Sequence, residues 1–111
     1  MDTGLSEIQI ENIKSVFAKY SELEDVILFG SRAKGNYKNN SDIDIALKGD
    51  IWFTIKNKIF NDIEELFLPF YVDIIIYSQI NNQDLKAHIE RVGISIYNKK
   101  NELENKFFSQ N

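Results

Sequence analysis

The sequence predicts a single small α/β domain, and three observations support this prediction. Apolar or alternating runs at residues 26–29, 41–48 and 71–77 have the pattern of strands. Stretches with helical apolar spacing lie before the first run, between the second and third, and after the third. The chain has 111 residues, which suffices for one core and is too short for two domains.

The composition excludes several classes of protein. With 43% hydrophobic and 27% charged residues, it is that of an ordinary soluble domain. The absence of cysteine excludes a disulfide framework and a thiolate metal site. A net charge of -4 argues against extended nucleic-acid binding, which needs a basic face. No leader pattern is present, and no apolar run approaches the roughly 20 residues of a membrane span, so we expect a cytoplasmic protein without membrane contact.

The first helix has a clear start signal. Ser6 and Gln9 have the spacing of a capping box, and Leu5 can pack on Ile10 as the accompanying hydrophobic staple. Apolar residues then recur at helical spacing, so we assign this helix to packing. The polar residues 21–25 are predicted to form the turn that leads into the first strand.

The first strand ends abruptly at Gly30 and Ser31. Glycine lets a ligand approach the backbone, and a serine that caps a following short helix would present N–H groups and a hydroxyl to an anion. Arg32, Lys34 and Lys38 form a small basic cluster beside them, sufficient for one triphosphate. The segment is a candidate phosphate site, and its alternatives are an ordinary turn and a solvated basic loop.

The second strand carries two carboxylates. Because side chains alternate along a strand, Asp42 and Asp44 point to one face, while Ile43 and Ile45 point to the other. Carboxylates beside a packed sheet are costly to desolvate unless a cation neutralises them, and oxygen ligands suit Mg2+ or Mn2+. The pair is a candidate metal site, and the alternative is a solvated strand edge.

A second helix and a third strand follow. The apolar face of the helix is predicted to lie in the core, and Pro69 ends the helix. The residues of this apolar face are Trp52, Ile55, Ile59, Ile63 and Leu66. The strand over residues 71–77 is apolar apart from Asp73, and a lone carboxylate there needs a cause. Asp73 is a candidate third site residue, with a structural salt bridge as the alternative.

A third helix is predicted to start at residues 81–84 and to end at Gly93. His88 lies near the edge of its apolar face, and we interpret this histidine as a packing residue outside the site. Residues 94–97 alternate and are predicted to form an edge strand.

The domain is therefore expected to cover residues 1–98, followed by a polar tail over residues 99–111. Leu103 and Phe107 are one helical turn apart in this tail. A helix there would either dock on a partner or cover the core of the domain itself.

The order of the candidate motifs resembles a known signature. Gly30-Ser31, ten intervening residues and then Asp42-x-Asp44 are similar to the signature of the DNA polymerase beta-like nucleotidyltransferase superfamily. Within it, the chain most resembles the minimal nucleotidyltransferase (MNT) family of bacteria and archaea. The segments that carry this resemblance are residues 29–35, 41–45 and 89–97. It implies the nucleotidyltransferase fold, a mixed central β-sheet flanked by helices.

The resemblance also implies roles for the site residues. Asp42, Asp44 and Asp73 would act as catalytic residues that hold two Mg2+ ions, and Asp73 would also favour deprotonation of the acceptor. The residues expected to cradle the triphosphate of ATP are Gly30, Ser31 and Arg32.

For function, the resemblance implies an enzyme that transfers AMP from ATP to a hydroxyl group and releases pyrophosphate. In the MNT family the partner is a small helical HEPN protein, often an RNase toxin, and the MNT protein is the antitoxin, which can add AMP to a tyrosine of the toxin. We therefore expect a protein adenylyltransferase in a hetero-oligomer with its toxin. The alternatives are a noncatalytic antitoxin that occludes the toxin and an adenylyltransferase for small molecules.

Overall fold

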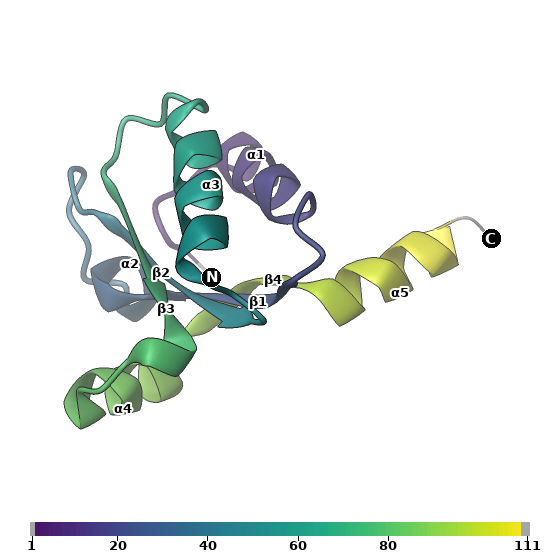
Figure 1. Ribbon diagram of the computed structural model, residues 1–111. Coiled ribbons are helices and arrows are strands. Elements are labelled where there is room, and N and C mark those ends of the chain that lie inside the picture. The colour runs from purple at the N-terminus through teal and green to yellow at the C-terminus, as the bar shows by residue number, and fades with distance from the viewer. Residues whose placement is uncertain (1, 110–111) are drawn as a thin grey trace.

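The computed structural model describes residues 2–109 and shows a four-stranded sheet with helices on both faces (Figure 1). The helices are α1 (Glu7–Phe17), α2 (Gly30–Lys34), α3 (Phe53–Glu64), α4 (Gln83–Val92) and α5 (Lys99–Ser109), and a 3-10 turn, η1, spans Tyr77–Gln79. The strands are β1 (Leu23–Phe29), β2 (Ile43–Gly49), β3 (Val72–Ile76) and β4 (Ile94–Asn98). No helix within residues 2–109 is long and apolar enough to cross a membrane.

The sheet has the order β3-β2-β1-β4 and is mixed. β1 is antiparallel to both β2 and β4, whereas β2 and β3 run parallel. A parallel pair needs a crossover connection, and α3 provides it. The predicted α/β class and the expected mixed sheet are both confirmed.

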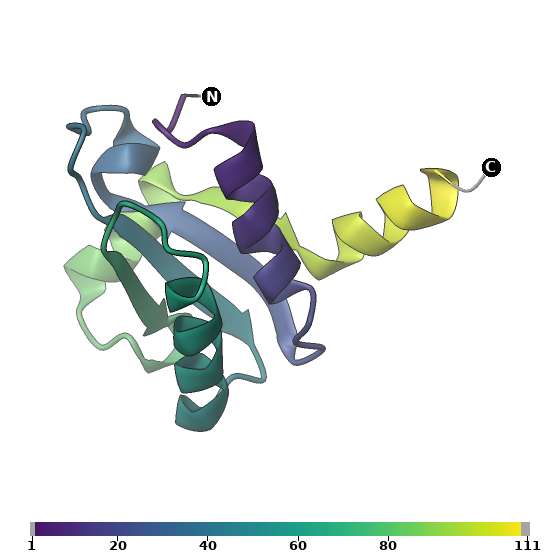
Figure 2. The ribbon, with the colours of Figure 1, turned by 90° about the horizontal axis from the view of Figure 1, so that it is seen from above.

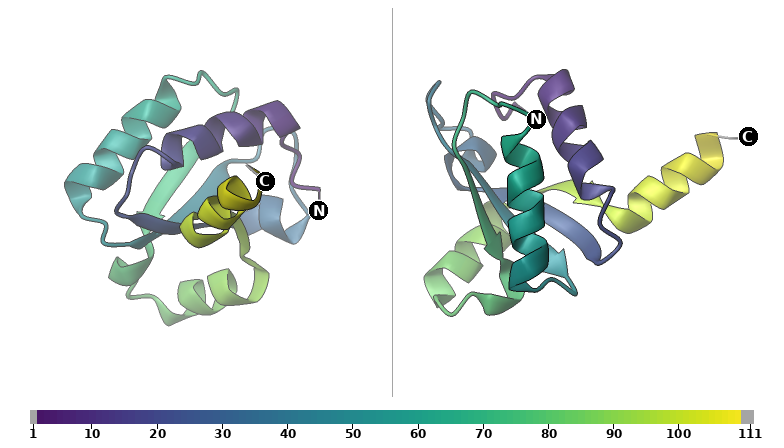
Figure 3. Two further views of the ribbon diagram at one scale, coloured as in Figure 1. Left: turned by 90° about the vertical axis from the view of Figure 1, so that its right-hand side faces the viewer. Right: turned by 45° about the horizontal axis from the view of Figure 1, so that its top comes forward.

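The two faces of the sheet are covered unequally. α1 and α3 pack on one face of the sheet (Figure 3). They bury the larger apolar cluster, which includes Phe17, Ile45 and Ile59. α4 covers part of the other face through Ile89. Alternation along β2 assigns Asp44 to the α4 side, because its neighbour Ile45 faces α1 and α3. The carboxylates therefore lie on the less covered face.

The N-terminal half confirms the predicted helix start and corrects the first strand. Ser6 caps α1 through a complete capping box with Gln9. The turn was predicted to cover residues 21–25, but this prediction is wrong from residue 23 onward, because β1 already begins at Leu23. Leu23 is fully buried and pairs with Gly49, so this one apolar residue anchors a strand end whose next residues are charged.

The predicted core face of the second helix also needs a correction. Trp52 is 67% exposed and lies before the first residue of α3, whereas Ile51 is 4% exposed and fills the core instead. Helical spacing counted from Trp52 therefore does not apply, because the helix begins one residue later. Ile59 and Ile63 are buried as predicted.

The polar tail forms α5, which projects away from the sheet (Figure 2). Lys99 donates a hydrogen bond from Nζ to Ser21 O at 2.9 Å, and Lys14 Nζ lies 2.9 Å from Glu102 Oε1. These contacts hold the start of α5 against α1 and the turn before β1, while Leu103 stays 59% exposed. The tail is thus helical, and its docking on a partner stays a prediction. Residues 1, 110 and 111 lie outside the described part of the chain.

Candidate active site

The candidate site is assembled by the register of three neighbouring strands. Asp44 on β2 pairs with Phe29, the last residue of β1, on one side. On its other side Asp44 pairs with Asp73 of β3. Residues paired directly across strands share a face, so Asp44 and Asp73 both project on the α4 side. The register therefore brings the Gly30 turn and two of the predicted carboxylates to one end of the sheet.

Asp42 completes the group of carboxylates. It is exposed, immediately precedes β2 and lies two residues from Asp44. Burial raises the pKa of Asp44 above its ordinary value, and the negative charges of Asp73 and Asp42 raise it further. Asp44 thus lies close enough to both Asp42 and Asp73 to be repelled by their charges.

These carboxylates are suited to Mg2+ in the presence of a polyphosphate. Within residues 2–109 no three His, Asp or Glu side chains converge closely enough to form a complete metal cage. Mg2+ in nucleotide sites does not need one, because one or two carboxylates, phosphate oxygens and water complete its shell. The mutual repulsion at Asp44 is the electrostatic environment that a cation relieves. Asp44 together with Asp42 or Asp73 would therefore suit Mg2+ with a triphosphate as co-ligand.

Gly30 has to be glycine in this arrangement. Its φ is +73°, in the left-handed region that side chains disfavour. A Cβ at this position would overlap Asp44 Oδ2. The backbone of the turn therefore lies directly against the carboxylate of Asp44, and a ligand of Asp44 would also meet this turn.

His88, assigned to packing from the sequence, also contacts the site. The Gly30 N–H donates to His88 Nε2 at 3.1 Å, and the imidazole packs edge-on against Phe29 with ring centroids 6.2 Å apart. The acceptor role places the proton of the neutral ring on Nδ1. The prediction that His88 is a packing residue is therefore correct in part, but it did not include the hydrogen bond to the Gly30 turn. The sequence carries no signal for it, because Gly30 and His88 are 58 residues apart.

Ser31 stands in the first turn of α2 and does not cap that helix. The N-cap position belongs to Phe29, whose side chain accepts no hydrogen bond from the helix, and the first N–H group, that of Gly30, donates to His88 instead. The prediction that Ser31 is the cap is therefore wrong, because the helix begins at Gly30. Among the described residues no hydrogen bond engages the Ser31 hydroxyl, which leaves it able to bind a ligand.

Arg32, which was expected to contact the triphosphate, is buried and bonded to backbone carbonyls of the protein itself. Its side chain is 1% exposed, and Nε and Nη2 donate to Ser41 O at 3.1 and 2.9 Å. Nη1 donates to Thr3 O at 3.0 Å, and the guanidinium stacks over Phe70 and Tyr37. The bonds to backbone carbonyls hold the loop before Asp42 and the N-terminal segment together. This geometry supports a structural role for Arg32 and does not support a contact with the triphosphate.

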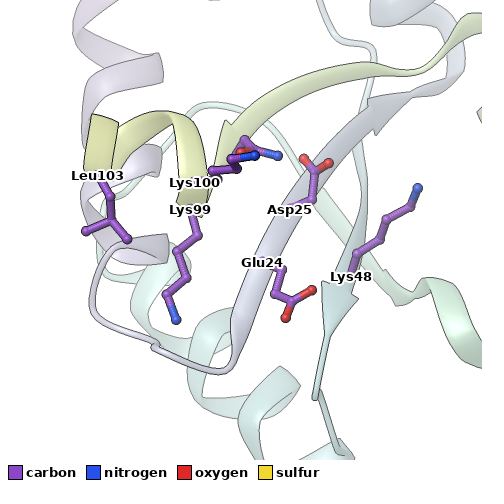
Figure 4. A pocket seen from close by; sticks show the side chains of 7 residues that line it. Glu24, Asp25, Lys48, Lys99, Lys100 and Leu103 are labelled. Carbon is purple, nitrogen blue, oxygen red and sulfur yellow. The ribbon is translucent and has the colours of Figure 1, made fainter. Parts of the chain in front are cut away.

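A separate depression of about 450 Å³ lies at the other end of the sheet, between β1, β2 and the start of α5. Figure 4 shows Glu24, Asp25 and Lys48 on one side of it, with Lys99 and Lys100 on the other. It contains none of the residues of the candidate site.

Comparison with known proteins agrees with this arrangement. The family model "Polymerase beta, Nucleotidyltransferase" matches residues 11–102. A chain of Methanocaldococcus jannaschii named as a protein adenylyltransferase is 43% identical over 44 residues, which cover 39% of this chain and 44% of that relative. The chain thus matches less than half of that relative's length.

Two solved structures share the fold. One, a toxin-antitoxin with AMP-PNP, has a TM-score of 0.65 at 20% identity, with 90% of this chain and 79% of the other covered. A second, the tri-AMPylated HEPN toxin of Shewanella oneidensis in complex with its MNT antitoxin, has a TM-score of 0.63 at 16% identity, with 90% and 78% covered. The match over residues 11–102, together with the register that gathers Gly30, Asp44 and Asp73, shows that this chain belongs to the polymerase beta nucleotidyltransferase family.

Proposed function

We propose that this chain transfers AMP from ATP to a hydroxyl group of a partner protein in a Mg2+-dependent reaction. The observation that carries the proposal is the register that places Asp44 between the Gly30 turn and Asp73. Family membership supports transfer of a nucleotide, and the matched relative's name supports a protein as acceptor.

Each side chain has a distinct part in the proposed reaction. Asp42, Asp44 and Asp73 hold the metal ions, and the turn at Gly30 and Ser31 receives the phosphates beside Asp44. Bound Mg2+ supplies charge neutralisation at the α-phosphate and at the leaving pyrophosphate. Asp73 accepts the proton of the acceptor hydroxyl. The hydroxyl oxygen then bonds to the α-phosphorus as the α–β phosphoanhydride bond breaks, and pyrophosphate leaves.

The proposed acceptor is a tyrosine of a HEPN toxin, so that the chain acts as an antitoxin in a cytoplasmic hetero-oligomer. The support is the shared fold with an MNT antitoxin that was solved together with an AMPylated HEPN toxin. The motifs of this sequence that resemble the MNT family point to the same class of partner.

Intact-mass spectrometry tests the proposal. The protein encoded beside this chain's gene is incubated with the chain, ATP and Mg2+, and a gain of one or more AMP units is expected. Asp44→Asn should abolish the gain in a folded chain. Asp50→Asn is the matched control, because Asp50 is exposed and follows β2 at the opposite end from Asp44, and it should retain the gain.

Two results would count against the proposal. Transfer by folded Asp44→Asn would overturn the assignment of this carboxylate. A stable complex without any gain of mass would favour the antitoxin that only occludes its partner.

A further inference from the structure

The outer edge of β3 presents unpaired backbone groups beside Asp73. β3 is the end strand of the sheet, and within residues 2–109 it pairs with β2 alone (Figure 1). The N–H of Ile43 on β2 donates to Tyr71 O at 2.9 Å, just before β3 begins. Backbone groups alternate in direction along a strand, so Asp73 and Ile75 direct their N–H and C=O groups toward β2.

The residues of β3 between these direct their backbone N–H and C=O groups away from the sheet. These are Val72, Ile74 and Ile76, whose side chains are buried against the core. Within residues 2–109 no strand pairs with this side of β3, so the outward groups of Val72 and Ile74 have no partner in the sheet. Buried side chains hold this edge in a fixed extended conformation. Such an edge is a template for another extended backbone unless charges, proline or a covering element protect it.

Two depressions lie along this edge, and Lys56 of α3 lines both of them. One of about 240 Å³ lies toward α3, where Asn57 and Phe60 line it next to the strand. The other, of about 300 Å³, lies toward α4 and is lined by Ile75, Ile80 and Leu85. The side chains of an added strand alternate between the two faces of the sheet, so they would meet the α3 side and the α4 side in turn.

We propose that an extended segment of the acceptor protein adds to the outer edge of β3 as a new strand and places its acceptor hydroxyl opposite Asp73. This inference rests on the proposed function, because it names how the acceptor reaches the site. A residue paired with Asp73 shares its face, so its side chain points toward the carboxylates. Backbone hydrogen bonds would give the affinity, and side-chain pockets the selectivity.

The register also predicts a preference in the acceptor sequence. If the acceptor residue of the added strand lies opposite Asp73, the residue two positions away lies opposite Ile75. Its side chain is on the same face of the sheet as the acceptor hydroxyl. That side chain would enter the apolar depression formed with Ile80 and Leu85. The acceptor segment should therefore contain a residue with a hydroxyl group and an apolar residue two positions from it.

Val72→Pro tests the edge directly. It removes one outward N–H at the first residue of an edge strand, where proline is tolerated, and leaves the ladder with β2 intact. Loss of one backbone hydrogen bond should raise the KM for the acceptor protein about five- to tenfold, with kcat and the Kd for ATP-Mg2+ unchanged. Val72→Ala, which keeps the N–H, is the matched control, and both variants are first shown to be folded. Equal KM values for the two variants would overturn the proposal.

Amide hydrogen exchange gives a second readout that does not depend on transfer. The probe is the protein encoded beside this chain's gene, bound to the wild-type chain. The amides of Val72, Ile74 and Ile76 should exchange at least tenfold more slowly in the complex, whereas those of Asp73 and Ile75 are already protected in the free chain. A complex in which the outward amides exchange as before would overturn docking at this edge. Protection without any transfer of AMP would instead overturn the proposed function alone.

Discussion

Replacing Gly30 by alanine is expected to disable the site through the carboxylate of Asp44. The φ of +73° at Gly30 costs an L-residue about 1–2 kcal/mol. A Cβ there would overlap Asp44 Oδ2 and lie 3.3 Å from its Cγ, so the carboxylate must rotate away. Forcing a side chain off its rotamer costs about 1 kcal/mol. The free energy of unfolding should fall by about 2–3 kcal/mol in total, and AMP transfer should be lost.

Gly35→Ala is the matched control. Gly35 has a φ of +92°, but nothing lies within 4 Å of a Cβ built there. This substitution carries only the backbone cost of about 1–2 kcal/mol and should leave AMP transfer intact. Urea unfolding measures the stability of both variants, and intact-mass spectrometry of the acceptor measures transfer.

The overlap itself can be isolated in a chain that carries Asp44→Ala. Without Oδ2 the two glycine substitutions should destabilise the domain equally, since only backbone strain remains. If Gly30→Ala and Gly35→Ala already cost the same in the presence of Asp44, the proposed contact has no energetic effect. Wild-type transfer by Gly30→Ala would refute the reasoning as a whole.

Substitutions at three positions probe the site and its surroundings. Because the pKa of Asp44 is raised in the folded chain, its carboxyl contributes stability at acid pH that is lost as the pH rises from 3.8 through the raised pKa. Asp44→Asn should therefore be more stable than wild type at pH 7, and an unchanged pH slope in urea titrations would contradict this. His88→Ala leaves the Gly30 N–H without its acceptor, so the domain should lose about 1 kcal/mol and ATP should bind several-fold more weakly. His88→Gln, which supplies an acceptor oxygen, should restore part of the affinity in calorimetric titration, and equal binding by the two variants would argue against the role of this bond. Arg32→Lys should lower the free energy of unfolding by about 3 kcal/mol, because an ammonium cannot reproduce the forked bonds to two carbonyls. Its Kd for ATP should stay unchanged, and a folded variant that fails to bind ATP would restore the phosphate-binding role.

The shared face of Asp42 and Asp44 could be predicted from strand alternation, which is a local property, whereas the approach of Gly30 and Asp73 to Asp44 was expected from the resemblance to the nucleotidyltransferase superfamily. The orientation of Arg32 could not be predicted, since it depends on the carbonyls of Thr3 and Ser41, which only the folded chain brings together. His88 illustrates the same limit: its position on a helix face is visible in the sequence, but its partner lies 58 residues away.

The distribution of the site along the chain has a consequence for when activity can arise. Asp44 is held between β1 and β3, and the Gly30 turn is held by a side chain of α4, so separate segments of sequence must all be in place. In a partly folded chain that has formed only the pairing of β1 with β2, neither Asp73 nor His88 is in place at the site. Nucleotide should therefore bind the native state alone and shift the folding equilibrium toward it by mass action. Newly synthesised chains would acquire the site in a single late step rather than gradually.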